Sequence, residues 1–201
     1  MVIKEREIDQ QLVLRAQRGD KIAFGLLVSK YQRRLFRLAY RLVGDQAEAE
    51  DIVQETFIKA YRALPQFRGD AAFYTWLYRI GVNAARNSLE SRGKRLPAIS
   101  SPEGSDDETF YASEHLTDID TPESLLLTKQ IAETVNQAMG DLPADLRTAL
   151  SLREMEGMSY EQIAGVMNTP IGTVRSRIFR AREAIAERLR PLLDTGLENR
   201  W

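Results

Sequence analysis

The fold of this chain is decided by residues 157–185, GMSYEQIAGVMNTPIGTVRSRIFRAREAI. Ser159 followed three residues later by Gln162 has the spacing of a capping box, which marks the start of a helix. Thr169 is a typical N-cap and Pro170 suits the first position of a helix, so a second helix begins after a very short connection. The stretch therefore predicts a helix-turn-helix, a unit that places its second helix in the major groove of DNA.

The second helix of this unit has one apolar side and one basic side. A solvated amphipathic helix is the commoner meaning of an arginine-rich face, but such a face alternates charge signs and has no reason to expose a phenylalanine. Arginine suits guanine edges and phosphates, and an outward phenylalanine packs on a thymine methyl group, so we expect duplex DNA to bind here. The expected buried stripe is Val174, Ile178, Ala181, Ile185 and Leu189, and the outward side holds Gly172, Thr173, Ser176, Phe179, Arg180 and Glu183, flanked by Arg175, Arg177 and Arg182.

Upstream, apolar residues recur at spacings of three and four, which predicts three further helices. The first ends near Gly44, Asp45 caps the second, and Pro65 stops it. Beyond residue 122 the same period predicts two helices before the quoted stretch, and no strand pattern competes. The expected inward residues are Phe24, Leu27, Val28, Tyr31, Leu35, Leu38 and Leu42 in the first helix, Val53, Phe57, Ala60, Tyr61 and Leu64 in the second, and Phe73, Trp76, Leu77, Ile80 and Ala84 in the third.

Two surfaces of the N-terminal half have more than one interpretation. In the second helix, Gln54, Glu55 and Ile58 lie away from the core stripe, where they form a docking face or plain surface, and periodicity alone favours plain surface. In residues 67–87, aromatic side chains off the core face and nearby arginines suit single-strand binding, and an amphipathic core helix explains them equally well. The residues concerned are Arg68, Tyr74, Tyr78, Arg79 and Arg86.

Composition narrows the class of protein. The 201 residues are 43% hydrophobic and 28% charged, which is typical of a soluble globular protein. No apolar run approaches the roughly 18 residues of a membrane helix, and the charged N-terminus is unlike a signal peptide, so we expect a cytoplasmic protein. The chain has no cysteine and a single histidine, His115, so disulfides, thiol catalysis and zinc fingers are excluded. We expect neither a metal nor a cofactor.

Residues 95–122 separate two expected domains, 1–94 and 123–201. The segment is rich in Pro, Gly and Ser, carries seven Asp and Glu against one Arg, and shows no helical or strand period. We therefore expect an all-α protein of two helical domains joined by a flexible acidic linker. A metal-dependent nuclease is the enzymatic alternative, but a metal site needs a rigid scaffold, and no nucleophile motif is present, so we expect no catalytic residue. The carboxylates that such a site would use are Glu103, Asp106, Asp107 and Glu108.

Three segments carry a resemblance to a known family: DIVQETFIKAYRAL (51–64), FRGDAAFYTWLYRIGVNAARN (67–87) and LPADLRTALSLREMEGMSYEQIAGVMNTPIGTVRSRIFRAREAI (142–185). With them the chain resembles the bacterial extracytoplasmic-function sigma factors of RNA polymerase, close to the sigma-E type. The resemblance implies that the N-terminal domain is sigma region 2, which binds core polymerase and recognises and melts the −10 promoter element. It implies that the C-terminal domain is sigma region 4, which recognises the −35 element.

The resemblance also assigns roles to individual residues. Asn83 falls at the position of a pocket for a flipped −10 base, and because extruding a base costs about a few kcal/mol, such a pocket makes melting depend on sequence. The residues implied are Asp51, Gln54 and Glu55 for the β′ clamp helices of core polymerase, Arg68, Tyr74, Tyr78, Arg79, Asn83 and Arg86 for the −10 element, and Arg153, Arg175, Ser176, Phe179, Arg180 and Arg182 for the −35 element.

The partners implied are core RNA polymerase, through its β′ clamp helices and β flap, promoter DNA, and a membrane-anchored anti-sigma factor. Such a factor would hold the protein inactive at the inner membrane until an envelope stress releases it. The alternative is an autonomous helix-turn-helix regulator that binds palindromic DNA as a dimer. That alternative leaves the N-terminal domain unexplained, and the sequence offers no obvious dimerisation helix or ligand pocket.

Overall fold

The computed structural model describes residues 2–95 and 122–198, which contain helices and no strand. This confirms the all-α class and the helix-turn-helix. The expected linker, with its four candidate metal carboxylates and His115, lies outside the described residues except for Arg95 and Pro122, which end and begin helices. The elements are α1 (Val2–Gln17), α2 (Lys21–Val43), α3 (Gln46–Ala63), the short 3-10 helix η1 (Leu64–Gln66), α4 (Phe73–Arg95), α5 (Pro122–Asp141), α6 (Ala144–Glu154), α7 (Tyr160–Met167) and α8 (Ile171–Glu198).

The N-terminal domain packs α1, α3 and α4 around α2. The side chain of Asp20 accepts hydrogen bonds from the backbone of Ile22 and Ala23 at the start of α2, and Gly44 ends the helix in the left-handed conformation that glycine adopts without strain. Asp45 then caps α3 by accepting from the Glu48 amide. The predicted helix end at Gly44 and the predicted cap at Asp45 are confirmed.

Helix α1 was not predicted, because its apolar residues form no sustained stripe. It is held by the buried side chains of Val13 and Ala16 and also by a buried polar contact. The carboxylate of Asp9 accepts from Lys30 Nζ at 2.6 Å and from the Tyr31 hydroxyl, both on α2. Asp9 is 4% exposed, and these two donors satisfy the charge that burial would otherwise penalise.

The C-terminal domain packs α5, α6 and α7 against α8. Ser159 and Gln162 form the predicted capping box at the start of α7, with both reciprocal hydrogen bonds present. The predicted N-cap role of Thr169 is wrong, since its hydroxyl is buried and has no hydrogen-bond partner among the described residues. The carbonyl of Pro170 accepts the first hydrogen bonds of α8 instead. The core consists of Ala149, Leu150, Leu152, Met158, Ile163, Val166, Met167, Val174, Ile178 and Ala181.

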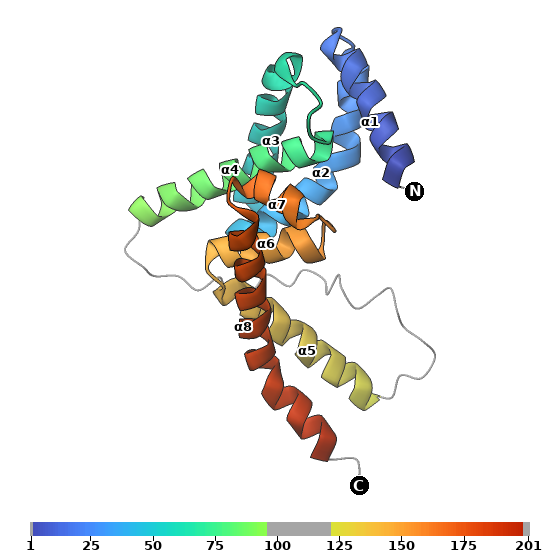
Figure 1. Ribbon diagram of the computed structural model, residues 1–201. Coiled ribbons are helices and arrows are strands. Elements are labelled where there is room, and N and C mark those ends of the chain that lie inside the picture. The colour runs from blue at the N-terminus through green and yellow to red at the C-terminus, as the bar shows by residue number, and fades with distance from the viewer. Residues whose placement is uncertain (1, 96–121, 199–201) are drawn as a thin grey trace.

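The two domains pack directly on each other. Helix α7 lies beside α4 and α6 lies against α2, while α5 and α8 run side by side away from the N-terminal domain (Figure 1). Arg147 on α6 reaches across the boundary, where its guanidinium donates to the Leu42 carbonyl at 3.1 Å. This carbonyl belongs to the last turn of α2, whose acceptors have no helical partner. Within the described residues no helix is long and apolar enough to cross a membrane.

Candidate nucleic-acid interface

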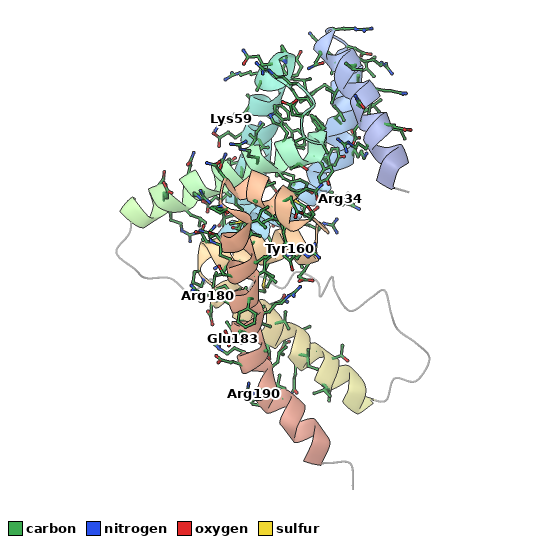
Figure 2. All side chains as sticks on the ribbon, viewed as in Figure 1. Arg34, Lys59, Tyr160, Arg180, Glu183 and Arg190 are labelled. Atoms are coloured by element: carbon green, nitrogen blue, oxygen red, sulfur yellow. The ribbon has the colours of Figure 1, made fainter. Side chains whose placement is uncertain are left out.

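The outward face of α8 is the first element of the interface. Its second and third turns present Ser176, Phe179 and Arg180 to solvent, while Val174 and Ile178 are buried on the opposite side. Phe179 is 66% exposed, which is unusual because phenylalanine side chains are usually buried in a protein core. Figure 2 shows Arg180, Glu183 and Arg190 following one another down α8. An exposed aromatic between arginines suits contact with base edges and methyl groups.

Tyr160, the first residue of α7, contacts one arginine at the end of α6 and another near the start of α8. The guanidinium carbons of Arg153 and Arg175 lie 4.8 Å and 5.5 Å from the centre of its ring. Both distances are within the range of cation–π attraction. Arg153 also donates to the Met158 carbonyl at 2.7 Å. The ring and this carbonyl therefore restrict the rotamers of both arginines before any ligand is bound.

The position of Arg182 suggests an unpaired side chain that donates hydrogen bonds to a DNA phosphate, but the structure shows it in an ion pair. Its guanidinium pairs with the Glu154 carboxylate at 2.5 Å, and this pairing raises the pKa of Arg182. Arg177 pairs in the same way with Asp145 at 2.5 Å. Both ion pairs connect α8 to α6, so a phosphate contact by Arg182 requires exchange of its partner. This exchange is easy for a solvent-exposed pair, whose net free energy is small.

The outer side of α3 borders a long open groove against α2. Asp51, Gln54 and Glu55 are exposed, as predicted, and Glu55 forms an ion pair with Lys59 one turn later at 2.5 Å. Ile58 is 46% exposed. The groove is lined from α3 by Asp51, Val53, Gln54, Phe57, Ile58 and Tyr61, and from α2 by Lys21, Phe24, Val28, Gln32, Arg33 and Phe36. A floor of apolar side chains between polar edges suits an amphipathic helix of a partner.

The loop before α4 and the exposed side of α4 hold most of the residues implied for the −10 element. Arg68, Arg79 and Asn83 are exposed. Arg86 is half-buried, with its guanidinium 3.5 Å from the Asp145 carboxylate at the start of α6. Gly69 in the loop has φ +78°, a conformation that favours glycine and turns the chain from η1 toward α4.

Tyr74 and Tyr78, which the resemblance implies for the −10 element, are not exposed in the structure. Tyr78 is 2% exposed and its hydroxyl donates to the Glu156 carboxylate of the C-terminal domain at 2.6 Å. Burial, followed by the negative charge of Glu156, raises the pKa of Tyr78 far above its ordinary range. Tyr74 is half-buried and its hydroxyl accepts from the Gln162 side chain. Both lie outside the stripe that the periodicity of α4 predicts, and the hydroxyl of each contacts the C-terminal domain.

Sequence reasoning missed Glu156, Gln162 and Arg147, which hold the two domains together. Gln162 carries a capping signal, but nothing in the sequence indicates that its side chain also crosses to α4. The described residues contain no group of His, Asp and Glu that could hold a metal ion. The interface residues described above offer hydrogen bonding, stacking and charge.

Two protein families match this chain, one in the N-terminal domain and one in the C-terminal domain. The family of sigma-70 region 2 matches residues 27–95, and the family of sigma-70 region 4 matches residues 131–185. The RNA polymerase sigma-H factor of Pseudomonas aeruginosa is 59% identical over 94% of this chain and 97% of its own length. The ECF RNA polymerase sigma-E factor of Escherichia coli K12 is 50% identical over 95% of this chain and 99% of its own length.

Two solved structures resemble the fold over most of the chain. CnrH in complex with the cytosolic domain of CnrY gives a TM-score of 0.64 at 26% identity, over 94% of this chain and 98% of that one. The sigma factor RpoE of Bartonella quintana, in complex with the anti-sigma factor NepR, also gives 0.64, at 25% identity over 83% of this chain and 96% of that one.

Proposed function

Because the chain belongs to the extracytoplasmic-function sigma factors of RNA polymerase, we propose that it divides promoter recognition between domains 1–94 and 123–201. The family confirms the resemblance carried by the sequence motifs. Members are initiation factors and not enzymes, so the protein acts by binding and positioning. The observation that carries the proposal is the pairing of an exposed, arginine-flanked recognition helix with a separate groove for a protein partner.

Core polymerase binds, in this proposal, along the groove between α2 and α3. Asp51 and Gln54 stand at its exposed edge, and Glu55 is exposed beside Gln54 on α3. These three residues contact the β′ clamp helices, while the C-terminal domain contacts the β flap. The exposed Ile58 supplies apolar area at the centre of the contact. Such an arrangement of apolar floor and polar edge is typical of helix-in-groove recognition.

The two promoter elements are bound by different chemistry. Asn83, Arg68, Arg79 and Arg86 bind the melted −10 strand by hydrogen bonding and charge, and the rings of Tyr74 and Tyr78 stack on it once their contacts with Gln162 and Glu156 have opened. In the C-terminal domain, base edges of the −35 duplex are bound from the exposed face of α8 and phosphates from its flanks. The −35 residues are Arg153, Arg175, Ser176, Phe179, Arg180 and Arg182.

Regulation by an anti-sigma factor is supported by one solved relative, the sigma factor RpoE of Bartonella quintana, which is in complex with the anti-sigma factor NepR. We propose that this chain also has an anti-sigma factor, that the partner is anchored in the inner membrane, and that the chain works in the cytoplasm once an envelope stress releases it. Pull-down from a membrane fraction with the full chain tests this: capture of an integral membrane protein that blocks core binding is expected, and capture of none contradicts it.

In vitro transcription tests the whole proposal. Core polymerase is incubated with and without this protein on templates that carry a sigma-E-type promoter, and the transcript start is mapped. We expect a promoter-specific transcript only when the protein is present. If core polymerase gains no specificity while the protein alone shifts palindromic duplex DNA, the autonomous regulator is correct instead.

Replacing Tyr160 by Leu is expected to weaken holoenzyme binding to a −35 duplex by about 3- to 10-fold. Each cation–π contact is worth about 0.5–1 kcal/mol at an exposed site, and losing both frees the Arg153 and Arg175 side chains. Fluorescence anisotropy of labelled promoter DNA measures the change. Tyr160→Phe keeps the ring and should restore nearly all of the affinity, whereas equal losses in both variants would assign the effect to the hydroxyl.

Replacing Asn83 by Ala is expected to slow promoter opening by about 3- to 10-fold, because a hydrogen bond to a captured base contributes about 0.5–1.5 kcal/mol. The fluorescence of 2-aminopurine placed in the −10 element measures opening, and binding to the −35 duplex should not change. Asn87 is the matched control, since it is an exposed asparagine one turn further along α4. If Asn87→Ala slows opening as much, Asn83 has no special place in the pocket.

A further inference from the structure

Gln17, the last residue of α1, contacts the segment that leads into the loop before α4. Its side-chain nitrogen Nε2 donates to two backbone carbonyls, that of Leu64 at 2.9 Å and that of Phe67 at 2.8 Å. These carbonyls belong to the first residue of η1 and to the residue that follows η1, and they come 47 and 50 residues after Gln17 in the sequence. One side chain of α1 therefore holds both ends of η1.

The corner between α1 and α2 fixes the position of Gln17. The carboxylate of Asp20, which caps α2, also accepts from Arg15 Nη2 at 2.7 Å, so it ties the last turn of α1 to the start of the next helix. Gly19 has φ +94°, a conformation that favours glycine and turns the chain between the two helices. Gln17 thus extends from a corner that has its own restraints.

Phe67 is held from its other side by the start of α4. Its ring centre lies 4.8 Å from that of Trp76 and 6.1 Å from that of Phe73. The next residues, 68–71, are exposed. Because the ring of Phe67 packs on α4 and its carbonyl accepts from Gln17, the direction in which the exposed part of the loop leaves the domain is set at this residue.

The exposed part of the loop borders a cavity on the side of α1. The cavity has a volume of about 390 Å³, and its lining residues include Gln10 and Gln17 of α1 and Arg68 and Gly69 of the loop. A loop that borders a cavity is restrained mainly by contacts at its ends. The two hydrogen bonds from Gln17 are such contacts, and α1 contributes no residue to the surfaces proposed above for core polymerase and promoter DNA.

We propose that Gln17 is a positioning residue for the −10 loop, which holds Phe67, and through it Arg68, in the place from which Arg68 binds the melted strand. The inference rests on the −10 function proposed above for this loop. A loop that is already held in its binding conformation needs little further ordering when the strand arrives, so less of the binding free energy is lost. Gln17 itself touches no DNA in this arrangement.

Promoter opening by the holoenzyme tests the inference, with 2-aminopurine fluorescence in the −10 element as the measurement. Gln17→Leu removes both donated hydrogen bonds at similar size, and we expect opening to slow by about 3- to 10-fold while binding to the −35 duplex stays the same. Gln17→Lys is one bond longer and keeps a nitrogen that donates to both carbonyls, so it should recover most of the rate.

Gln11→Leu is the matched control, since it removes an exposed glutamine from the same helix, and it should leave opening unchanged. An unchanged rate in Gln17→Leu would overturn the inference, as would an equal loss in Gln11→Leu. Failure of Gln17→Lys to recover the rate would overturn it too, because the loss would then come from packing and not from the donated hydrogen bonds.

Trp76 reports whether the loop is released. The chain has two tryptophans, so Trp201→Phe leaves Trp76 as the single one, with the Phe67 ring against it. In this background Gln17→Leu should shift the emission to longer wavelength and increase quenching by acrylamide. Slower opening with unchanged emission and quenching would show that Gln17 does not act by holding Phe67, which would also overturn the inference.

A double variant separates failure of this inference from failure of the proposed function. If Gln17 acts through the loop, Gln17→Leu should slow opening little further in an Arg68→Ala background, whereas full multiplication of the two effects would mean independent action and overturn the inference. If Arg68→Ala slows opening and Gln17→Leu does not, the proposed function stands and the positioning role does not. If neither Arg68→Ala nor Asn83→Ala slows opening, the proposed −10 surface is itself wrong.

Discussion

Core RNA polymerase is expected to bind the double variant Asp51→Ala, Gln54→Ala about 30-fold more weakly than the unaltered protein. Residues that dominate a protein interface lose about 2 kcal/mol or more on truncation, and each 1.4 kcal/mol is tenfold in affinity. Both side chains are exposed on the edge of the groove that Phe57, Ile58 and Tyr61 line. Competition with a labelled sigma factor for core polymerase measures the affinity.

The fold of this double variant should be unaffected, because exposed substitutions change stability by about 0.5 kcal/mol or less. For a domain of this size that corresponds to a shift of about 4 °C or less in Tm. Glu90→Ala serves as a control, since it removes an exposed carboxylate from α4, outside the groove. Full core affinity in the double variant, or an equal loss in Glu90→Ala, would contradict a binding site at the outer side of α3.

Local signals in the sequence predicted those parts of the fold that depend on neighbours within a few residues. The capping box of Ser159 and Gln162 and the left-handed Gly44 are properties of one helix end. Such ends are specified by hydrogen bonds between residues three to five apart, so they can be inferred without knowing what the helix packs against. The apolar stripes of α2 and α8 were predicted for the same reason.

Contacts between distant segments were not predicted, because periodicity indicates a face but not what covers it. Asp9 of helix α1 is 21 residues from Lys30 and finds this partner only in the folded domain. Tyr78 lies outside the predicted core stripe of α4, yet it is buried and its hydroxyl donates to Glu156, 78 residues later. An amphipathic pattern cannot distinguish a face that awaits a ligand from one that contacts another domain of the same chain.

In the candidate site too, local features were predicted from the sequence and long-range contacts were not. Exposure of Arg180, Phe179 and Asn83 follows from their position on a helix, and the structure agrees. The partners of the other arginines do not follow from position. Arg153 stacks on Tyr160 and Arg182 pairs with Glu154, because these side chains are long enough to reach across the helix-turn-helix. For long charged side chains, a motif therefore predicts where the residue lies on the helix but not which partner its charged group contacts.

Replacing Arg175 by Ala is expected to reduce transcription from the promoter by about 5- to 150-fold. A bidentate contact between arginine and a guanine edge is worth about 1–3 kcal/mol of discrimination, and each 1.4 kcal/mol is a factor of ten. Arg175 is exposed near the start of α8, and the Tyr160 ring restricts its rotamers. Run-off transcription with reconstituted holoenzyme, at one fixed salt concentration, measures the loss.

Arg190→Ala separates base recognition from general attraction to DNA. Arg190 is an exposed arginine of the same helix, 15 residues later and about 22 Å along its axis. Its loss should reduce promoter binding slightly and equally for all −35 sequences, because a phosphate contact carries no sequence information. Arg175→Ala should instead flatten the preference at one base pair. If a panel of single −35 substitutions ranks the same for Arg175→Ala as for the unaltered protein, Arg175 contributes charge alone, and sequence recognition must come from Ser176, Phe179 or Arg180.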